Sequence, residues 1–166
     1  MPFSSLGERV KPGGNRRSKE ISLVIEKALL PVVDLNEFPN AVVDVFIELP
    51  QTDAGTRCAG LCAASIALAD AGIIMKDMVS AVAVGRVDDK IVADLSYDEE
   101  AYECEKGVAD IPIAIIPSTG EISLLQMDGK ISKEELAKAI ELAKKVCVKI
   151  NEAQKKALKE KYQVRK

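Results

Sequence analysis

The sequence TDAGTRCAGLCAASIALADA, residues 52–71, combines a helix-forming run with groups that attract anions. Its second part is rich in alanine and predicts a closely packed helix, and Gly55, Thr56 and Arg57 stand at the start of that helix. A helix N-terminus has unpaired backbone N–H groups and the positive end of the helix dipole. Such a start favours either an anion site at these three residues or an ordinary helix start capped by Asp53 or Thr56.

A second cationic group lies near the beginning of the chain. Asn15 is placed to cap a helix that begins at Arg16, after a glycine-containing loop, and ends before Pro31. Arg16 and Arg17 then occupy the first helical turn, where they oppose the helix dipole unless an anion lies nearby. The alternative is that both arginines are solvated on a surface turn.

The remaining periodicities predict a single α+β domain that covers residues 1–166. A capping box at residues 132–135 opens the last element, a long amphipathic C-terminal helix within residues 132–166. The expected elements before it are helix 16–30, strand 41–49, helix 56–71, a hairpin of 79–87 and 90–95, an acidic loop at 96–106, and a hairpin of 111–116 and 122–127.

The composition excludes several kinds of chemistry. The chain has no histidine, which excludes Ser-His-Asp catalysis and histidine-ligated metal sites. The four cysteines form no Cys-x-x-Cys pair, so we expect small buried thiols and no zinc site. No apolar stretch is long enough for a membrane span, and we expect a soluble, cytoplasmic protein without membrane contact.

Three longer segments resemble the RNase PH family, and within it the catalytic subunits of the archaeal exosome. They are PFSSLGERVKPGGNRRSKEIS (2–22), DVFIELPQTDAGTRCAGLCAASIALADAGIIMKDMV (44–79) and ADIPIAIIPSTGEISLLQMDGKIS (109–132). The resemblance implies an RNase PH-like fold, which is also the fold of domain 2 of ribosomal protein S5. It covers about the C-terminal two-thirds of that domain, and it implies further strands and RNA-contacting arginines upstream.

The resemblance implies a phosphate-dependent 3′→5′ exoribonuclease that releases nucleoside diphosphates from RNA. It makes Arg17, Gly55, Thr56 and Arg57 the phosphate-binding residues and Arg16 an RNA-binding neighbour. Asp110 becomes a catalytic acid and a ligand for Mg²⁺ or Mn²⁺, with inorganic phosphate as the co-substrate. The implied partners are RNA, a non-catalytic RNase PH-like subunit in a hexameric ring (a trimer of heterodimers), and RNA-binding cap proteins.

A second family aspartate has no direct counterpart in this sequence. Counting back from Asp110 places Cys104 at its position, whereas counting forward from Asp94 places Glu100 there. Cysteine is a poor ligand for a hard metal ion. Glu100, Glu103 and Glu105 therefore remain candidates for the second catalytic carboxylate.

Three functions are compatible with these observations. The first is an active phosphorolytic subunit of an exosome-type ring. The second is a non-catalytic, RNA-binding structural subunit of the same kind of ring, favoured by Cys104 and by the upstream half that the sequence lacks. That lack is compatible with a fragment, a misassigned start or a separately encoded half. The third is another phosphate-ester or nucleotide-binding domain.

Overall fold

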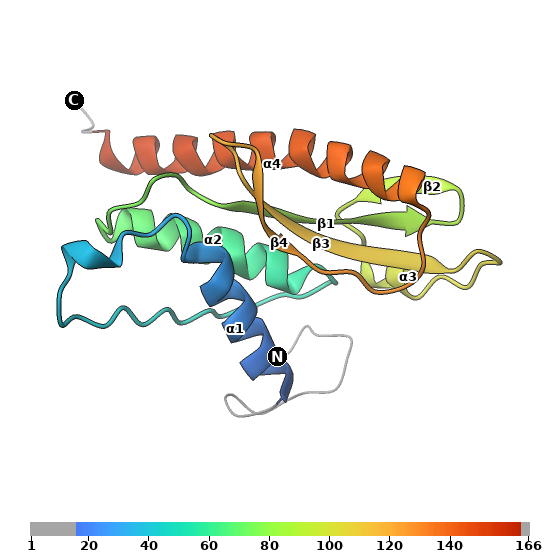
Figure 1. Ribbon diagram of the computed structural model, residues 1–166, viewed down its shortest axis with the longest axis horizontal. Coiled ribbons are helices and arrows are strands. Elements are labelled where there is room, and N and C mark those ends of the chain that lie inside the picture. Colours follow the sequence, from blue (N-terminus) through green and yellow to red (C-terminus); the bar gives the residue numbers. More distant parts are fainter. Residues whose placement is uncertain (1–15, 164–166) are drawn as a thin grey trace.

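One antiparallel sheet of four strands organises the computed structural model, which describes residues 16–163 (Figure 1). The strands follow one another in space in the order β2-β1-β3-β4, so the two hairpins lie side by side with β1 and β3 at the centre. Their bounds are β1 Ser80–Val87, β2 Lys90–Ala93, β3 Val108–Ile116 and β4 Glu121–Leu125.

Helices cover both faces of this sheet and give three layers (Figure 1). Helices α1 (Arg16–Leu29) and α2 (Thr56–Asp70) pack on one face, and the long helix α4 (Lys133–Tyr162) packs on the other. Helix α4 begins at the expected capping box, in which Ser132 and Glu135 satisfy each other's backbone N–H groups. A short 3-10 turn, η1 (Leu35–Glu37), follows α1.

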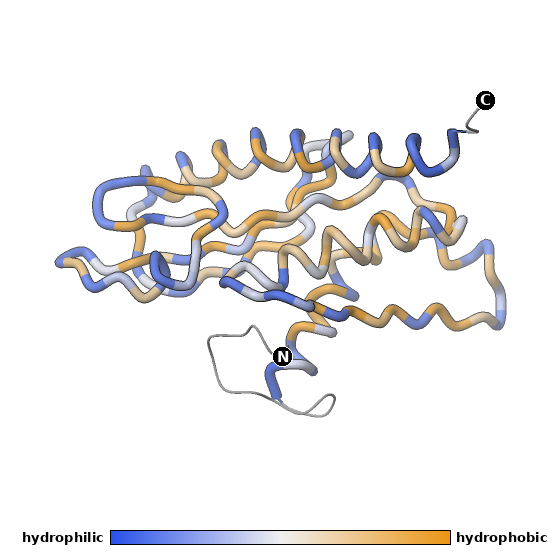
Figure 2. The backbone as a smooth tube through the Cα atoms, turned by 180° about the vertical axis from the view of Figure 1, so that it is seen from behind, coloured by the Kyte–Doolittle hydropathy of each residue, from blue (hydrophilic) through white to orange (hydrophobic). Residues whose placement is uncertain are grey.

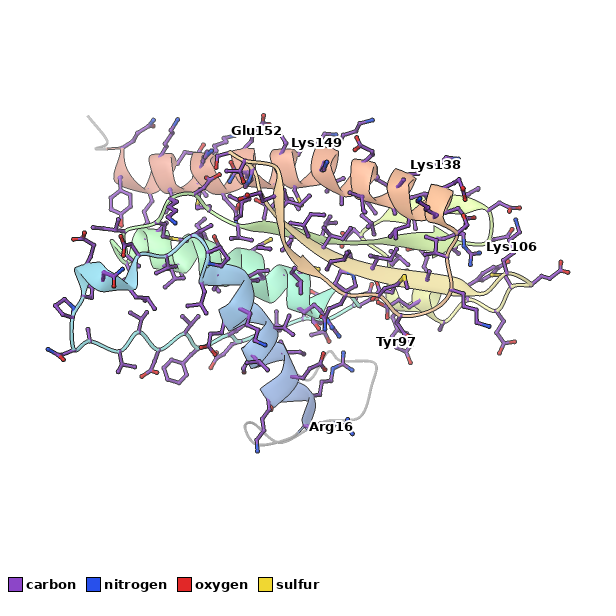
Figure 3. The ribbon with its side chains drawn as sticks, viewed as in Figure 1. Arg16, Tyr97, Lys106, Lys138, Lys149 and Glu152 are labelled. Carbon is purple, nitrogen blue, oxygen red and sulfur yellow. The ribbon has the colours of Figure 1, made fainter. Side chains whose placement is uncertain are left out.

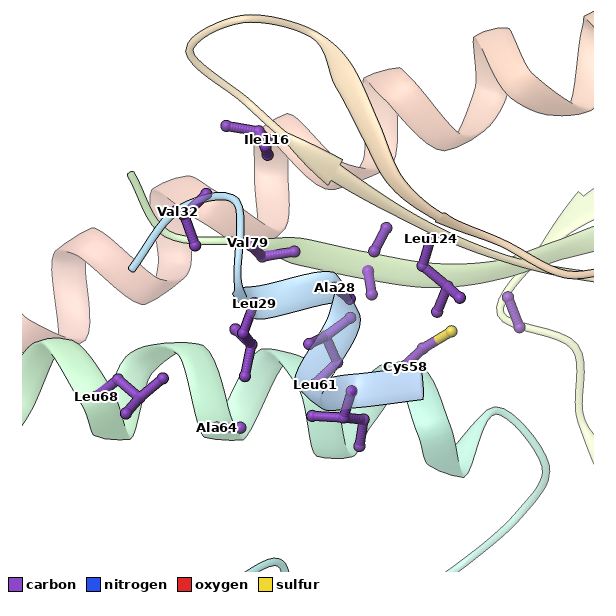
Figure 4. Packing of buried hydrophobic residues seen from close by; sticks show 14 residues of the cluster. Ala28, Leu29, Val32, Cys58, Leu61, Ala64, Leu68, Val79, Ile116 and Leu124 are labelled. Atoms are coloured by element: carbon purple, nitrogen blue, oxygen red, sulfur yellow. The ribbon is translucent and has the colours of Figure 1, made fainter. Parts of the chain in front are cut away.

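Two apolar cores separate the three layers. The core beneath α1 and α2 includes Ala28, Leu61 and Val79, all of which are fully buried (Figure 4). The core beneath α4 includes Ile111 and other residues of the central strands that point to the opposite face. Apolar and polar residues alternate along α4 (Figure 2), as expected for a helix with one buried side. Because both faces of β3 are covered, its sequence is almost continuously apolar.

The strand expected at residues 41–49 is wrong. This segment runs extended beside α1 and α2 but forms no ladder with any residue that the structure describes (Figure 1). Phe46 is 89% exposed, whereas Ile47 packs against the core beside α2. Its β-branched residues favour an extended backbone, but a strand also needs a neighbour that accepts its hydrogen bonds.

The loop expected at residues 96–106 contains a short helix, α3 (Tyr97–Glu100). The hydroxyl of Ser96 accepts the N–H of Glu99, and the Glu99 carboxylate accepts the N–H of Ser96. This capping box was present in the sequence but was hidden by the acidic composition of the segment. The expected N-cap Asn15, by contrast, lies outside the described residues.

The cysteine side chains behave largely as expected. Cys58 and Cys147 are buried, Cys62 and Cys104 are partly buried, and all four are free thiols. Burial raises the pKa of the Cys147 thiol to about 12, so this sulfur is protonated at physiological pH. Across residues 16–163, no helix combines the length and the apolar character that crossing a membrane requires.

Candidate active site

A pocket of about 790 Å³ opens where the first turns of α1 and α2 approach α3 and the beginning of β3. Figure 3 labels two of its lining residues, Arg16 on α1 and Tyr97 on α3. The pocket brings together residues that are far apart in the sequence. The expected site residues that line it are Arg16, Arg17, Gly55, Thr56, Arg57, Glu100 and Asp110.

The N-terminal end of α2 faces this pocket without a side-chain cap. Its N-cap residue is Gly55, whose φ of 53° lies in the left-handed region that favours glycine. Asp53 does not cap α2, because its Oδ1 accepts the backbone N–H of Tyr97 at 2.8 Å. In the described part of the chain, the N–H groups of Thr56 and Arg57 have no acceptor. These donors are therefore available to an anion.

The side chain of Arg57 crosses the pocket from α2 and is about one-quarter exposed. Its Nη1 donates to Oε1 of Gln126, which follows strand β4, and lies 3.6 Å from Oε1 of Glu20 on α1. Arg17 lines the same pocket from the first turn of α1. Two guanidinium groups and a helix N-terminus therefore face one space, which is a geometry suited to phosphate oxygens.

Asp110 places a carboxylate in the same pocket from strand β3. Its backbone N–H and C=O pair with those of Asp128 at 2.9 and 2.8 Å. One carboxylate oxygen, Oδ1, is buried and has no hydrogen-bond partner among the described residues. Burial raises the pKa of Asp110, which the positive charge of Arg57 and the backbone N–H of Ile111 partly offset.

Glu100 is the other expected catalytic carboxylate that lines the pocket. It is the last residue of α3, which the capping box of Ser96 and Glu99 holds over the pocket. Burial raises the pKa of Glu100, and the negative charge of Asp110 raises it further, whereas Arg17 lowers it. The two carboxyl groups thus interact electrostatically within one pocket.

The other two glutamate candidates lie elsewhere. Glu103 and Glu105 are exposed on the turn between α3 and β3 and do not line the pocket. Cys104 also lies outside the pocket, and its Sγ donates to the backbone oxygen of Gly107 at 3.2 Å. The sequence left three glutamates as candidates for the second catalytic carboxylate. Of these, only Glu100 lines the same pocket as Asp110.

The oxygen atoms at this site fit a hard divalent cation. Mg²⁺ prefers oxygen ligands and is commonly held by one or two carboxylates together with water and substrate phosphate. The unpartnered Oδ1 of Asp110 and the neighbouring carboxylate of Glu100 match this ligand set. Among residues 16–163 there is no cluster of three or more His, Cys, Asp or Glu side chains suited to a metal.

Several lining residues escaped the sequence analysis. Gln126 and Asp128 follow strand β4 and reach the pocket because β4 pairs with β3 next to Asp110. The sequence could have indicated Glu20 and Tyr97. Each lies three residues along a helix from an expected site residue, Glu20 from Arg17 and Tyr97 from Glu100. The other lining residues are Thr52, Asp53, Ala54, Pro112 and Met127.

Comparison with known protein families divides the chain into two matched parts. Residues 1–74 match the model described as "3′ exoribonuclease family, domain 1", and residues 77–146 match "3′ exoribonuclease family, domain 2". The expected phosphate-binding residues fall in the first part, and Glu100 and Asp110 fall in the second.

Curated relatives match almost the whole chain. The "Exosome complex component Rrp41" of Thermococcus gammatolerans is 55% identical over 97% of this chain, and that of Methanopyrus kandleri is 50% identical over the same share. The chain spans 63% and 65% of the lengths of these two relatives. Among solved structures, rice (Oryza sativa) Rrp46 matches 90% of this chain and 69% of its own, with a TM-score of 0.75 and 20% identity. The rice structure supports the fold alone.

Proposed function

Since this chain belongs to the 3′ exoribonuclease (RNase PH) family, we propose that it degrades RNA from the 3′ end by phosphorolysis. The reaction would transfer the terminal nucleotide from RNA to inorganic phosphate and release a nucleoside diphosphate. One observation carries this proposal: a single pocket brings the arginines and the N-terminus of α2 together with the carboxylates of Glu100 and Asp110.

The cationic end would hold the nucleophile. Inorganic phosphate would lie against the N-terminus of α2, between the guanidinium groups of Arg17 and Arg57. Binding fixes the attacking oxygen in line with the scissile bond, which removes most of the entropic cost of a reaction between two molecules. No side chain needs to act as the nucleophile, in agreement with the lack of histidine.

The carboxylate end would act on the leaving group. Glu100 and Asp110 both have raised pKa values, mainly because of burial, so their carboxyl groups hold a proton to higher pH than exposed ones. A protonated carboxyl here would donate to the departing 3′ oxygen. A bound Mg²⁺ or Mn²⁺ would supply charge stabilisation for the phosphoryl oxygens, with the deprotonated Asp110 as its protein ligand, which leaves the proton to Glu100.

RNA would approach along the first turn of α1, where Arg16 is exposed. We propose contacts to the RNA backbone there, which give little sequence preference and a marked dependence on salt. The proposed working form is a cytoplasmic hexameric ring with a non-catalytic RNase PH-like partner subunit, closed by RNA-binding cap proteins. The relatives, which are named as components of an exosome complex, support the proposal that the chain works as part of a complex.

The test is nucleoside diphosphate release from a 3′-labelled oligo(A), with Mg²⁺, with and without phosphate, in the presence of the partner subunit. We expect release that requires phosphate, and a loss of about 100-fold or more in Arg57→Ala or Glu100→Gln. Glu103→Gln removes an equal charge three residues away, outside the pocket, and should retain full activity.

Two results would contradict the proposal. The first is RNA degradation that does not need phosphate. The second is an assembled ring that binds RNA but releases no diphosphate, which would instead support the non-catalytic structural subunit.

A further inference from the structure

Gln126 connects three elements at the cationic end of the pocket. Its backbone N–H donates to the oxygen of Pro112 at 3.1 Å, which fixes it to strand β3 two residues beyond Asp110. Its side-chain oxygen accepts the Nη1–H of Arg57, and its Nε2 donates to Oε1 of Glu20 at 3.2 Å. One amide group therefore reaches both α2 and α1.

The two neighbours of Arg57 act on it by different physical means. Gln126 is uncharged and holds one guanidinium nitrogen by a hydrogen bond, so it restricts the orientation of the group without cancelling its charge. Among the described residues it is the one acceptor that hydrogen-bonds this guanidinium. The side chain that this bond holds lines the pocket.

Glu20 contributes charge more than orientation. Its Oε1 lies 3.6 Å from Nη1 of Arg57, beyond hydrogen-bond distance, and its side chain is 48% exposed. A carboxylate at this distance lowers the positive potential that a phosphate would meet at Arg57. The bond from Gln126 keeps that carboxylate near the guanidinium.

We propose that Gln126 and Glu20 set the affinity of the pocket for inorganic phosphate in opposite directions. Gln126 is a positioning residue that orients Arg57 for phosphate. Glu20 is an anionic side chain that competes with phosphate for Arg57. This inference rests on the function proposed above, because it assumes that Arg57 binds phosphate.

The experiment measures the dissociation constant of inorganic phosphate by isothermal titration calorimetry with the full chain. Gln126→Met keeps the length of the side chain and removes both hydrogen bonds, so we expect binding about tenfold weaker. Glu20→Gln keeps an oxygen that accepts from Gln126 and removes the charge, so we expect binding about threefold tighter. Glu26→Gln removes the same charge from an exposed position on α1 that does not line the pocket and should leave binding unchanged.

The opposite signs distinguish this proposal from a purely structural role, which would weaken phosphate binding in both variants. In the assembled ring, the KM for phosphate should change in parallel with the dissociation constants, while kcat changes less than twofold. Thermal unfolding reports whether Gln126→Met is folded. Glu20→Gln alters a half-exposed side chain and provides an independent test if that variant is not folded.

The outcomes separate the two proposals. If the unmodified chain and Arg57→Ala bind phosphate equally, or neither binds it, the proposed function fails. If Arg57→Ala loses binding while Gln126→Met retains it, or if Glu20→Gln binds more weakly, this inference is overturned and the proposed function stands.

Discussion

Asp110 is a pocket residue whose burial costs the folded state stability when its carboxyl group is charged. Its buried Oδ1 has no partner among the described residues, and burial raises the pKa of the carboxyl group above its ordinary value of 3.8. A raised pKa means that the folded state binds the proton more tightly than the unfolded state. The charged form therefore costs stability, and this cost grows as the pH rises through the folded-state pKa.

We predict that Asp110→Asn raises the melting temperature at pH 7 by about 2–3 °C, because it removes a buried charge. The gain should disappear below the ordinary pKa of 3.8, where the Asp110 carboxyl group is protonated in both the folded and the unfolded chain. Thermal unfolding followed by circular dichroism at both pH values tests this. Asp44→Asn, in an exposed segment, removes the same charge and should show no such gain; a lower melting temperature for Asp110→Asn at pH 7 would contradict the argument.

The position of the second carboxylate illustrates what a sequence leaves open at the scale of a residue. Glu100, Glu103 and Glu105 lie within five residues of one another, and counting from either side gives different answers. The choice depends on how the chain turns between Asp94 and Asp110. The short helix α3 determines that turn, and it places Glu100 alone of the three in the pocket.

At the scale of secondary structure, the elements predicted correctly are those with local signals. The helices beginning at Arg16 and Thr56, both hairpins and the capping box of α4 follow from periodicity, turns and caps within a few residues. The strand at 41–49 failed because pairing depends on a distant neighbour, which no local pattern specifies. Helix α3 was not predicted, because the acidic composition of residues 96–106 favours a loop and conceals the capping box of Ser96 and Glu99.

Helix α3 is only four residues long, so its N-terminal hydrogen bonds hold most of its structure. We predict that Ser96→Ala lowers kcat for diphosphate release about fivefold, because Glu100 loses its fixed orientation, while costing about 1 kcal/mol of stability or less. The phosphate dissociation constant should not change, since Arg57 lies on α2. Ser96→Thr retains the capping hydroxyl and should restore kcat; a Thr variant as impaired as the Ala variant would argue against capping as the cause.

At the scale of the whole molecule, one buried arginine, Arg86, forms hydrogen bonds to three of the connecting segments between secondary-structure elements. Arg86 on β1 is 3% exposed and lies on the α4 side of the sheet. Its guanidinium donates to the backbone oxygens of Asp88, Lys106 and Lys130 at 2.7–2.9 Å. Its Nε lies 3.7 Å from Oε1 of Glu135 on α4. The three oxygens belong to the β1–β2 turn, the connection before β3 and the connection before α4.

We predict that Arg86→Met lowers the free energy of unfolding by about 3–5 kcal/mol, because it leaves a carboxylate and three carbonyl groups without their shared partner. Urea unfolding at 25 °C measures this change. Lys90→Met, at an exposed position of the same hairpin, is the matched control and should change stability by less than about 0.5 kcal/mol. A loss of about 1 kcal/mol or less for Arg86→Met would show that the connections are held mainly by other contacts.

The order of the elements along the chain determines which of them are made first during translation. Among residues 16–163, those that line the pocket lie between positions 16 and 128, whereas α4, which covers the opposite face of the sheet, begins at Lys133. A nascent chain on the ribosome therefore contains these pocket residues before the helix that buries the other side of β1 and β3 emerges. We expect the pocket to become rigid only after α4 has packed on that face, because until then the apolar side of β1 and β3 is uncovered.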